Sequence, residues 1–289
     1  MVFFVGVCRK SGSIISMTSL NPQLEPAAEI IRQADTLFIL AGAGLSTEVG
    51  IPTYWTSEDG VYGGGKTSHG YTPLEHSDAG LWMQDTVSQI EYFAEKRKQF
   101  ASIDFRSSIY GTLLEKVQGR NYFCVTSNVD SGFFRAGFDE ERLFEVHGSH
   151  RACQCVMDAV HGVFPAHDEV TLTCPVCGMP TRPNVLFFND NEFNPEILYG
   201  QQARFNSFLD ASVQDGSEKD RVAILELGVG NTVPRVRQVG NRLYRDYMTA
   251  DYLHVNLEPE PEFLFGGSCS FENKEQWIQM RASDFIQAL

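Results

Sequence analysis

Two short stretches put polar side chains at points where buried strands should end. The sequence TSNVD covers residues 126–130 and EVHGS covers residues 145–149. An amide and a carboxylate at one strand end suit hydrogen bonds to a ribose or an amide ligand, and a histidine at the next can act as a general base near neutral pH. A single strand-end histidine is more often structural, but His147 beside Asn128 and Asp130 favours a catalytic site.

A glycine-rich stretch, LAGAGLSTEVGIPTYW (40–55), follows the apolar run TLFIL (36–40). Backbone N–H groups at such a turn can hold a phosphate, but a strand-to-helix turn that needs positive φ explains the glycines equally well. The dinucleotide fingerprint G-x-G-x-x-G fails because Thr47 stands at the third glycine, and no acidic residue ends the second strand. A hydride-transferring dehydrogenase is therefore disfavoured. The later stretch GVGNT (228–232) could hold the far half of a nucleotide.

Four of the seven cysteines form two close pairs, CQC (153–155) and CPVC (174–177). The second pair is a knuckle whose Pro and Gly turn both sulfur atoms toward one metal ion, and four thiolates would close a structural zinc site. One residue separates the first pair where two to four are usual, so His150 or His161 could replace one of its cysteines. Free cysteines are the simpler alternative, and a catalytic zinc is disfavoured. The predicted metal ligands are Cys153, Cys155, Cys174 and Cys177.

The elements that must position these residues alternate between helical and extended patterns. Helices are expected at 26–35, 89–100 and 107–117, and strands at 36–44, 122–130, 143–149, 184–190, 221–231 and 252–258. Apolar strands separated by helices predict an α/β protein with a Rossmann-like parallel sheet covered by helices on both faces. Ligands of such sheets bind beyond the carboxyl ends of the strands, where the polar residues lie here. The Gly-rich segment 56–77 resembles a flap.

Composition narrows the function further. The chain has 289 residues, 43% of them hydrophobic, and a formal net charge of −14. Such a charge disfavours direct binding to nucleic acid, and no apolar run is long enough to span a membrane. The few, clustered cysteines indicate a reducing, cytoplasmic compartment rather than a secreted disulfide scaffold. Residues 1–16 are left out of the fold argument because Met17 is a second possible start, although a targeting role for this extension stays open.

The ordered motifs resemble those of the sirtuins, the NAD-dependent protein deacylases. GAGLSTEVGIPTYW (42–55) is similar to the family's G-A-G-x-S-x-x-S-G-I-P-D-F-R, TSNVD to its T-Q-N-I/V-D, and FEVHGS (144–149) to its E-L-H-G-S. CPVCGMPTRPNVLFF (174–188) resembles C-P-x-C-G-x-x-x-R-P-D-V-V-F-F, where a strand pairs with the acylated peptide. The similarity runs in the family's order from about residue 25 to residue 258.

The resemblance implies an enzyme that uses NAD to deacylate lysine side chains of a protein or peptide, releasing nicotinamide and O-acyl-ADP-ribose. His147 would be the general base, Asn128 would be catalytic, and Val185 and Leu186 would pair with the substrate backbone. The implied NAD-binding residues are Gly42, Ala43, Gly44, Ser46, Thr47, Ile51, Pro52, Tyr54, Trp55, Ser127, Asn128, Asp130, Gly228, Gly230, Asn231, Thr232, Asn256 and Leu257. Zinc would be the second cofactor.

The implied organisation has three parts. An extension covers 1–24, an NAD-binding domain 25–149 and 183–289, and a small zinc-binding module 150–182, to which the flap and helices of 56–105 contribute. The sequence leaves the oligomeric state unknown.

Several residues depart from the family pattern. Thr53 and Trp55 stand where sirtuins have Asp and Arg, and Ser127 stands at the usual Gln. The ending LELGVGNTVPRVR (225–237) resembles a divergent bacterial-type branch and some macrodomain-linked sirtuins, which transfer ADP-ribose and typically lack the histidine present here as His147. A sirtuin-fold ADP-ribosyltransferase or NAD hydrolase is therefore the second hypothesis, and a catalytically silent NAD sensor the third.

Overall fold

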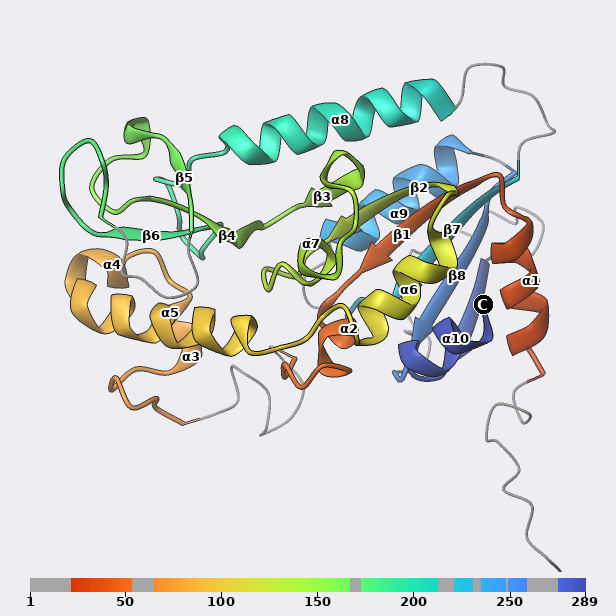
Figure 1. Cartoon of the computed structure of the whole chain (residues 1–289), viewed down its shortest axis with the longest axis horizontal. Coiled ribbons are helices and arrows are strands. Elements are labelled where there is room, and N and C mark those ends of the chain that lie inside the picture. The colour runs from red at the N-terminus through yellow and green to blue at the C-terminus, as the bar shows by residue number, and fades with distance from the viewer. Residues whose placement is uncertain are drawn as a thin grey trace, which may run out of the picture.

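A computed structural model describes residues 22–53, 65–166, 173–212, 221–230, 235–247, 249–258 and 275–289. Two sheets organise these residues (Figure 1). The larger sheet lies at the right of the view and the smaller at the left. Within the described residues, no helix combines the length and the apolar character that crossing a membrane requires.

The larger sheet has six strands in the order β3-β2-β1-β7-β8-β9, and every neighbouring pair is parallel. Its strands are β1 (Thr36–Ala41), β2 (Asn121–Thr126), β3 (Leu143–Glu145), β7 (Val222–Leu227), β8 (Asp251–Asn256) and β9 (Glu275–Gln279). All six residues of β1 are buried, as are all six of β7, because helices cover both faces. The predicted Rossmann-like sheet is confirmed.

Two sets of helices cover the faces of this sheet. One core packs Ile31, Tyr110 and Phe285 against it, from α1 (Leu24–Gln33), α6 (Ile109–Val117) and α10 (Ala282–Ala288). The other packs Phe205 and Val236 against the opposite face, from α8 (Glu196–Ser212) and α9 (Arg235–Asp246). Alternate residues of β1 point to opposite cores, as the two-residue period of a strand requires.

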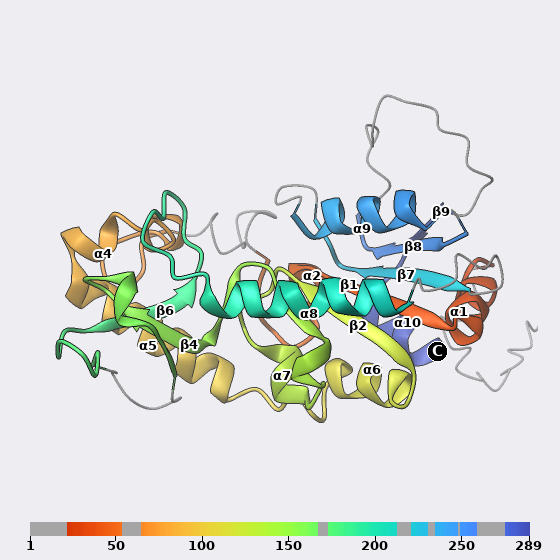
Figure 2. The same cartoon turned by 90° about the horizontal axis from the view of Figure 1, so that it is seen from above.

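The smaller sheet has three antiparallel strands in the order β5-β4-β6, which are β4 (Gly148–Cys155), β5 (Val163–Pro165) and β6 (Thr181–Val185). Beside it lie α3 (Pro73–His76), α4 (Leu81–Gln84) and α5 (Thr86–Ala101), and α8 spans both sheets (Figures 1 and 2). The expected strand at 184–190 therefore differs in place and extent. Its first residues close β6 in the small sheet, because β6 pairs with β4 and not with the parallel strands.

Short elements connect these units: α2 (Ala43–Thr47), α7 (Gly132–Ala136), η2 (Glu140–Arg142) and η3 (Ala159–His161). The expected helices at 26–35, 89–100 and 107–117 correspond to α1, α5 and α6. Asp85 and Ser108 begin α5 and α6 by accepting hydrogen bonds from the backbone N–H groups of Ser88 and Tyr110. The sequence analysis did not identify β9, α8, α9 or α10.

Residue 148 must be a glycine because of the close contact at the junction between the two sheets. Its φ is +75°, and a Cβ atom there would lie 2.1 Å from the carbonyl oxygen of Asn184. We expect Gly148→Ala to lower the free energy of unfolding by more than about 4 kcal/mol, because backbone strain and a clash with β6 add together.

Gly119→Ala is the matched control. Its φ is +80°, but an added Cβ would meet no atom within 4 Å. It should cost only about 1–2 kcal/mol for the left-handed conformation. Urea unfolding of both variants checks this, and equal losses would show that contact with β6 contributes nothing.

Candidate functional site

A cavity of about 380 Å³ lies between the carboxyl ends of the parallel strands and the small sheet. Its size is typical of small-molecule sites. One half is lined by the loops that follow β1, β7 and β8, and the other by α5 and the end of β6. The lining residues are Gly42, Ala43, Gly44, Ile51, Pro52, Thr53, Ser77, Tyr92, Phe93, Lys96, Phe100, Ser127, Asn128, Val129, His147, His150, Val185, Leu186, Phe187, Phe188, Gly228, Val229, Gly230, Asn256 and Glu258.

The glycines after β1 meet the loop after β7. A Cβ atom on Gly42 would lie 2.7 Å from the carbonyl oxygen of Gly228, and one on Gly44 would lie 2.7 Å from the Cα of Gly228. Gly42 has φ −117°, so positive φ does not explain it. These glycines are required because another backbone segment of the protein itself, the loop after β7, approaches them closely. The same contact places both loops on the cavity wall.

Asn128 is held in a fixed orientation. Its Nδ2 donates to the carbonyl oxygen of Gly42 (3.0 Å) and to the Tyr110 hydroxyl (3.3 Å), which also lies 3.0 Å from Ser46 Oγ. No described residue donates to Asn128 Oδ1, which leaves this oxygen for a ligand. Sequence reasoning missed Tyr110, because one tyrosine inside an amphipathic helix carries no distinguishing signal.

Asp130 and Ser46 stay outside the cavity wall. Ser46 Oγ donates to Asp130 Oδ2 at 2.6 Å, and the Gly132 backbone N–H donates to Oδ1 at 2.7 Å. Burial raises the pKa of Asp130, and these hydrogen bonds partly offset the rise. The geometry gives this pair a role in shaping the loop after β2. Thr47, whose hydroxyl donates to the Gly44 carbonyl, and Leu257, which is exposed, also lie outside the wall.

His147 follows β3 and lines the cavity. Burial and the nearby Arg235 guanidinium lower its pKa to about 4, while a hydrogen bond to the Ser127 backbone acts in the opposite direction. The imidazole is therefore neutral at pH 7 and can accept a proton. Arg235, which donates to the Val146 carbonyl at 2.9 Å, was not among the predicted site residues.

A network of buried hydrogen bonds supports the part of the cavity wall formed by the loops after β7 and β8. The Val229 carbonyl accepts hydrogen bonds from Asn256 Nδ2 (3.0 Å) and from Arg237 (2.7 Å). Arg237 in turn pairs with Glu226, whose carboxylate also accepts from the Tyr252 hydroxyl at 2.8 Å. Gly228, Gly230 and Asn256 line the cavity as expected. The predicted residues Tyr54, Trp55, Asn231 and Thr232 lie outside the described residues.

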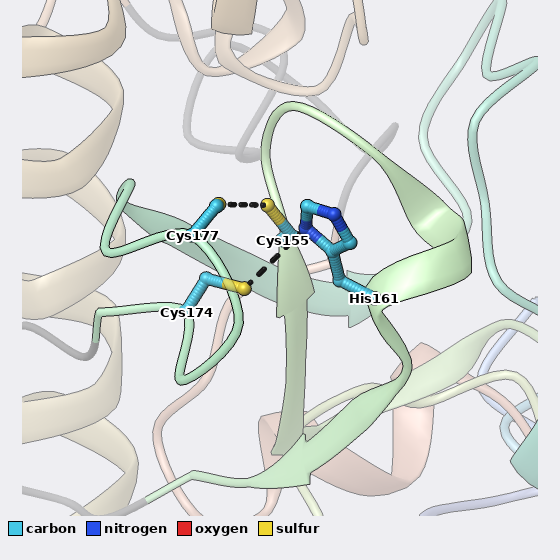
Figure 3. A group of neighbouring side chains, drawn as sticks. All are labelled: Cys155, His161, Cys174 and Cys177. Atoms are coloured by element: carbon cyan, nitrogen blue, oxygen red, sulfur yellow. Dashed lines mark hydrogen bonds between the residues drawn. The ribbon is translucent and has the colours of Figure 1, made fainter.

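A second cluster lies in the small-sheet region, away from the cavity wall. The side chains of Cys155, His161, Cys174 and Cys177 point toward one another, with all ligand atoms within 4.8 Å (Figure 3). Three thiols and one imidazole suit a tetrahedral zinc ion with no open position. Burial raises the pKa of Cys174, but backbone N–H groups of Cys177 and Val176 and the neighbouring thiols bring it down to about 7, which favours a thiolate.

This geometry corrects one predicted ligand. The structure puts His161, the alternative kept open above, in the place expected for Cys153. Two positions along a strand are about 6.6 Å apart. Cys155 ends β4 beside the knuckle, whereas Cys153 lies farther back, with its Sγ 3.5 Å from the Phe164 carbonyl.

The fold is that of known Sir2 proteins. A solved Sir2 homologue in complex with NAD superposes with a TM-score of 0.61 at 18% identity, covering 96% of this chain and 93% of the homologue. The sequence also identifies the protein family. A profile of the Sir2 family matches residues 42–202, so the chain belongs to the Sir2 family.

Two curated relatives have different activities in their names. NAD-dependent protein deacetylase SIR2rp1 of Leishmania major is 27% identical over 242 residues, covering 78% of this chain and 63% of the relative. A protein ADP-ribosyltransferase of Staphylococcus aureus is 26% identical over 276 residues, covering 83% of this chain and 81% of the relative. This chain thus spans less than two thirds of the Leishmania protein.

Proposed function

We propose that this protein is an NAD-dependent protein lysine deacylase of the sirtuin type. The neutral His147 in the cavity shared by both sheets is the observation that carries the proposal, because deacylation requires a general base that deprotonates a ribose hydroxyl. NAD supplies the glycosidic bond that breaks and the ADP-ribose that receives the acyl group. Gly42, Gly44 and Gly228 line the cavity, where their backbone would contact the dinucleotide.

Residues of this chain orient the substrates and remove a proton from a ribose hydroxyl. Asn128 Oδ1 can accept a hydrogen bond from the nicotinamide end of NAD, because Gly42 and Tyr110 fix its amide. His147 takes a proton from a ribose hydroxyl. The substrate backbone runs beside Leu186, whose N–H donates to the His147 carbonyl (2.9 Å) and whose own carbonyl receives no described donor. In this proposal the Leu186 carbonyl oxygen accepts a hydrogen bond from a backbone N–H of the acylated peptide.

The remaining assignments belong to the same proposal. The Cys155, His161, Cys174 and Cys177 cluster holds a structural zinc ion. Residues 25–149 and 183–289 form the NAD-binding domain, and 150–182 the zinc module with help from 56–105. The substrate is an acylated protein or peptide. A zinc site built from thiolates requires reduced cysteines, which supports a reducing compartment such as the cytoplasm.

The low pKa of His147 has a kinetic consequence. We expect kcat/KM to stay level as the pH is lowered to about 5, because the base must be neutral and its pKa lies near 4. If the base were a histidine with an unshifted pKa, kcat/KM would fall to half its maximum near pH 6.5. A profile of kcat/KM against pH measures this, and a midpoint near 6.5 would contradict the assignment.

Stability must be followed across the same range. His147 and His150 stay neutral in the folded protein, with pKa values of about 4 and 3, while the unfolded chain binds protons from about pH 6.5 downward. The free energy of unfolding therefore falls as the pH drops below 6.5. Circular dichroism at each pH separates unfolding from protonation of the base.

ADP-ribosyl transfer is the alternative, favoured by the Staphylococcus aureus relative and by Ser127. Mass spectrometry of the protein with NAD and acetyl-lysine peptides separates the hypotheses. NAD-dependent loss of the acyl mass supports the deacylase. A gain of ADP-ribose mass on protein, or nicotinamide release with unchanged peptide, would replace it with a transferase or hydrolase. NAD binding without turnover would leave a sensor.

A further inference from the structure

Three side chains that can carry a charge lie inside the larger sheet, on the face that α9 covers. Glu226 of β7 is 2% exposed, Arg237 of α9 is 5% exposed and His254 of β8 is 1% exposed. Strands covered on both faces are normally apolar, and a buried ion pair is often no more stabilising than apolar side chains of similar size. The stability of the sheet alone therefore does not explain these residues.

The Glu226 carboxylate accepts hydrogen bonds at both of its oxygen atoms. Arg237 and His254 Nδ1 (3.1 Å) contact Oε1, and the Tyr252 hydroxyl donates to Oε2 at 2.8 Å. His254 Nε2 lies 3.0 Å from Glu275 of the edge strand β9. Burial alone would lower the pKa of His254, but its hydrogen bonds to Glu226 and Glu275 raise it. Glu226 is thus held from three sides and fixes the Arg237 guanidinium.

The same guanidinium contacts the loop that forms part of the cavity wall. Arg237 Nη2 donates to the Val229 carbonyl oxygen at 2.7 Å, and Asn256 Nδ2 donates to the same oxygen at 3.0 Å. Val229 lies between Gly228 and Gly230, and all three residues line the cavity. Glycines on both sides give this short loop little conformational preference of its own. Its shape therefore depends on contacts such as these.

Helix α9 lies close enough to the sheet to make this contact because Gly240 has no side chain. A Cβ atom on Gly240 would lie 2.1 Å from the Tyr252 hydroxyl oxygen and 2.6 Å from Leu40 Cδ1. The same Tyr252 hydroxyl donates to Glu226. The packing of α9 on Tyr252 thus positions Arg237 and its carboxylate partner together.

We propose that Arg237, fixed by Glu226, is a positioning residue for NAD, which holds the loop at 228–230 in the shape that receives the adenosine end of the dinucleotide. The inference rests on the NAD binding of the proposed function. There the nicotinamide end lies beside Asn128, after β2, so the loops after β7 and β8, on the other side of β1, are left for the adenosine end. Among the described residues that line the cavity Arg237 is absent, so it acts through the Val229 carbonyl.

Calorimetry with NAD and with ADP-ribose, in the absence of peptide, tests this. Arg237→Met should lower the affinity for both ligands by about 10- to 100-fold, the range of a hydrogen bond to a charged group. Equal losses would place the effect away from nicotinamide, which ADP-ribose lacks. Arg237→Lys can still donate to the Val229 carbonyl and should recover part of the loss. In turnover, the KM for NAD should rise while kcat at saturating NAD stays near the wild-type value.

Leu243→Ala separates positioning from stability. Leu243 is a buried residue of the same helix, so its truncation should lower the unfolding temperature. Its affinity for both ligands should match that of the wild type, because Arg237 still holds the loop. Arg242→Met, which removes an exposed arginine from α9, should also bind both ligands normally.

Arg237→Met should fold, because Tyr252 and His254 still partner the Glu226 carboxylate. Should it not fold, Glu226→Gln serves for the same comparison. This variant keeps Arg237 but replaces its charged partner by an amide, and it should lower both affinities by about two- to tenfold, the range of one neutral hydrogen bond.

Wild-type affinity in folded Arg237→Met, or an equal loss in Leu243→Ala, would overturn this inference and leave the deacylase standing. With Glu226→Gln as the test variant, wild-type affinity would overturn it in the same way. A loss confined to the Arg237 and Glu226 variants would support the inference even if no acyl-lysine peptide reacts, an outcome that would count against the deacylase alone.

Discussion

We expect His147→Ala to lower the rate of deacylation by about 10²- to 10⁴-fold, the usual contribution of a positioned general base. The imidazole is neutral because burial and Arg235 disfavour its charged form, and it lines the cavity. The affinity for NAD should change little, since the backbone around Gly42 and Gly228 would supply most dinucleotide contacts.

Two measurements check this prediction. Product formation is followed by mass spectrometry and NAD affinity by calorimetry, on the wild type and on His147→Gln as well, which keeps a polar side chain but no base. Both variants should bind NAD and form little product. Undiminished product formation by either variant would show that His147 is not the general base.

The second large effect concerns the metal. We expect about one zinc ion per chain, and Cys177→Ser and His161→Ala should each weaken zinc binding by more than about 100-fold, because loss of a direct ligand exceeds loss of an outer contact. Apparent zinc binding at such sites is worth about 10–16 kcal/mol, so these variants should also unfold at lower temperature.

Cys153→Ser is the matched control. It changes a buried cysteine of the same strand whose Sγ faces the Phe164 carbonyl, outside the cluster. Zinc content by elemental mass spectrometry should stay near one ion per chain. If Cys153→Ser loses zinc while His161→Ala keeps it, Cys153 is the ligand. A folded, active protein without metal would disprove the site altogether.

Local sequence patterns predicted most of the parallel sheet. The run at 36–40 is apolar throughout because β1 is buried on both faces, and the polar residues Asn128 and His147 follow β2 and β3, as strand-end sites require. These strands can be predicted from the sequence alone, because a strand buried on both faces is apolar along its whole length.

Other features depend on contacts between distant segments. The choice of His161 over Cys153 follows from where β4 ends relative to the knuckle, which spacing alone does not determine. Strand β6 joins the small sheet because Gly148 allows close approach to Asn184. Tyr110 contributes through a hydrogen bond to Asn128, 18 residues away, and no local pattern marks such a pair.

The most direct test of the deacylase is the product balance of one reaction. NAD and an acetyl-lysine peptide are incubated with the protein, and nicotinamide, free-lysine peptide and O-acyl-ADP-ribose are quantified together by mass spectrometry. The account predicts equal amounts of all three for each NAD consumed, and about 10²- to 10⁴-fold slower formation of the free-lysine peptide by His147→Ala. Nicotinamide accompanied by free ADP-ribose or by ADP-ribosylated protein, with the peptide still acylated, would contradict it.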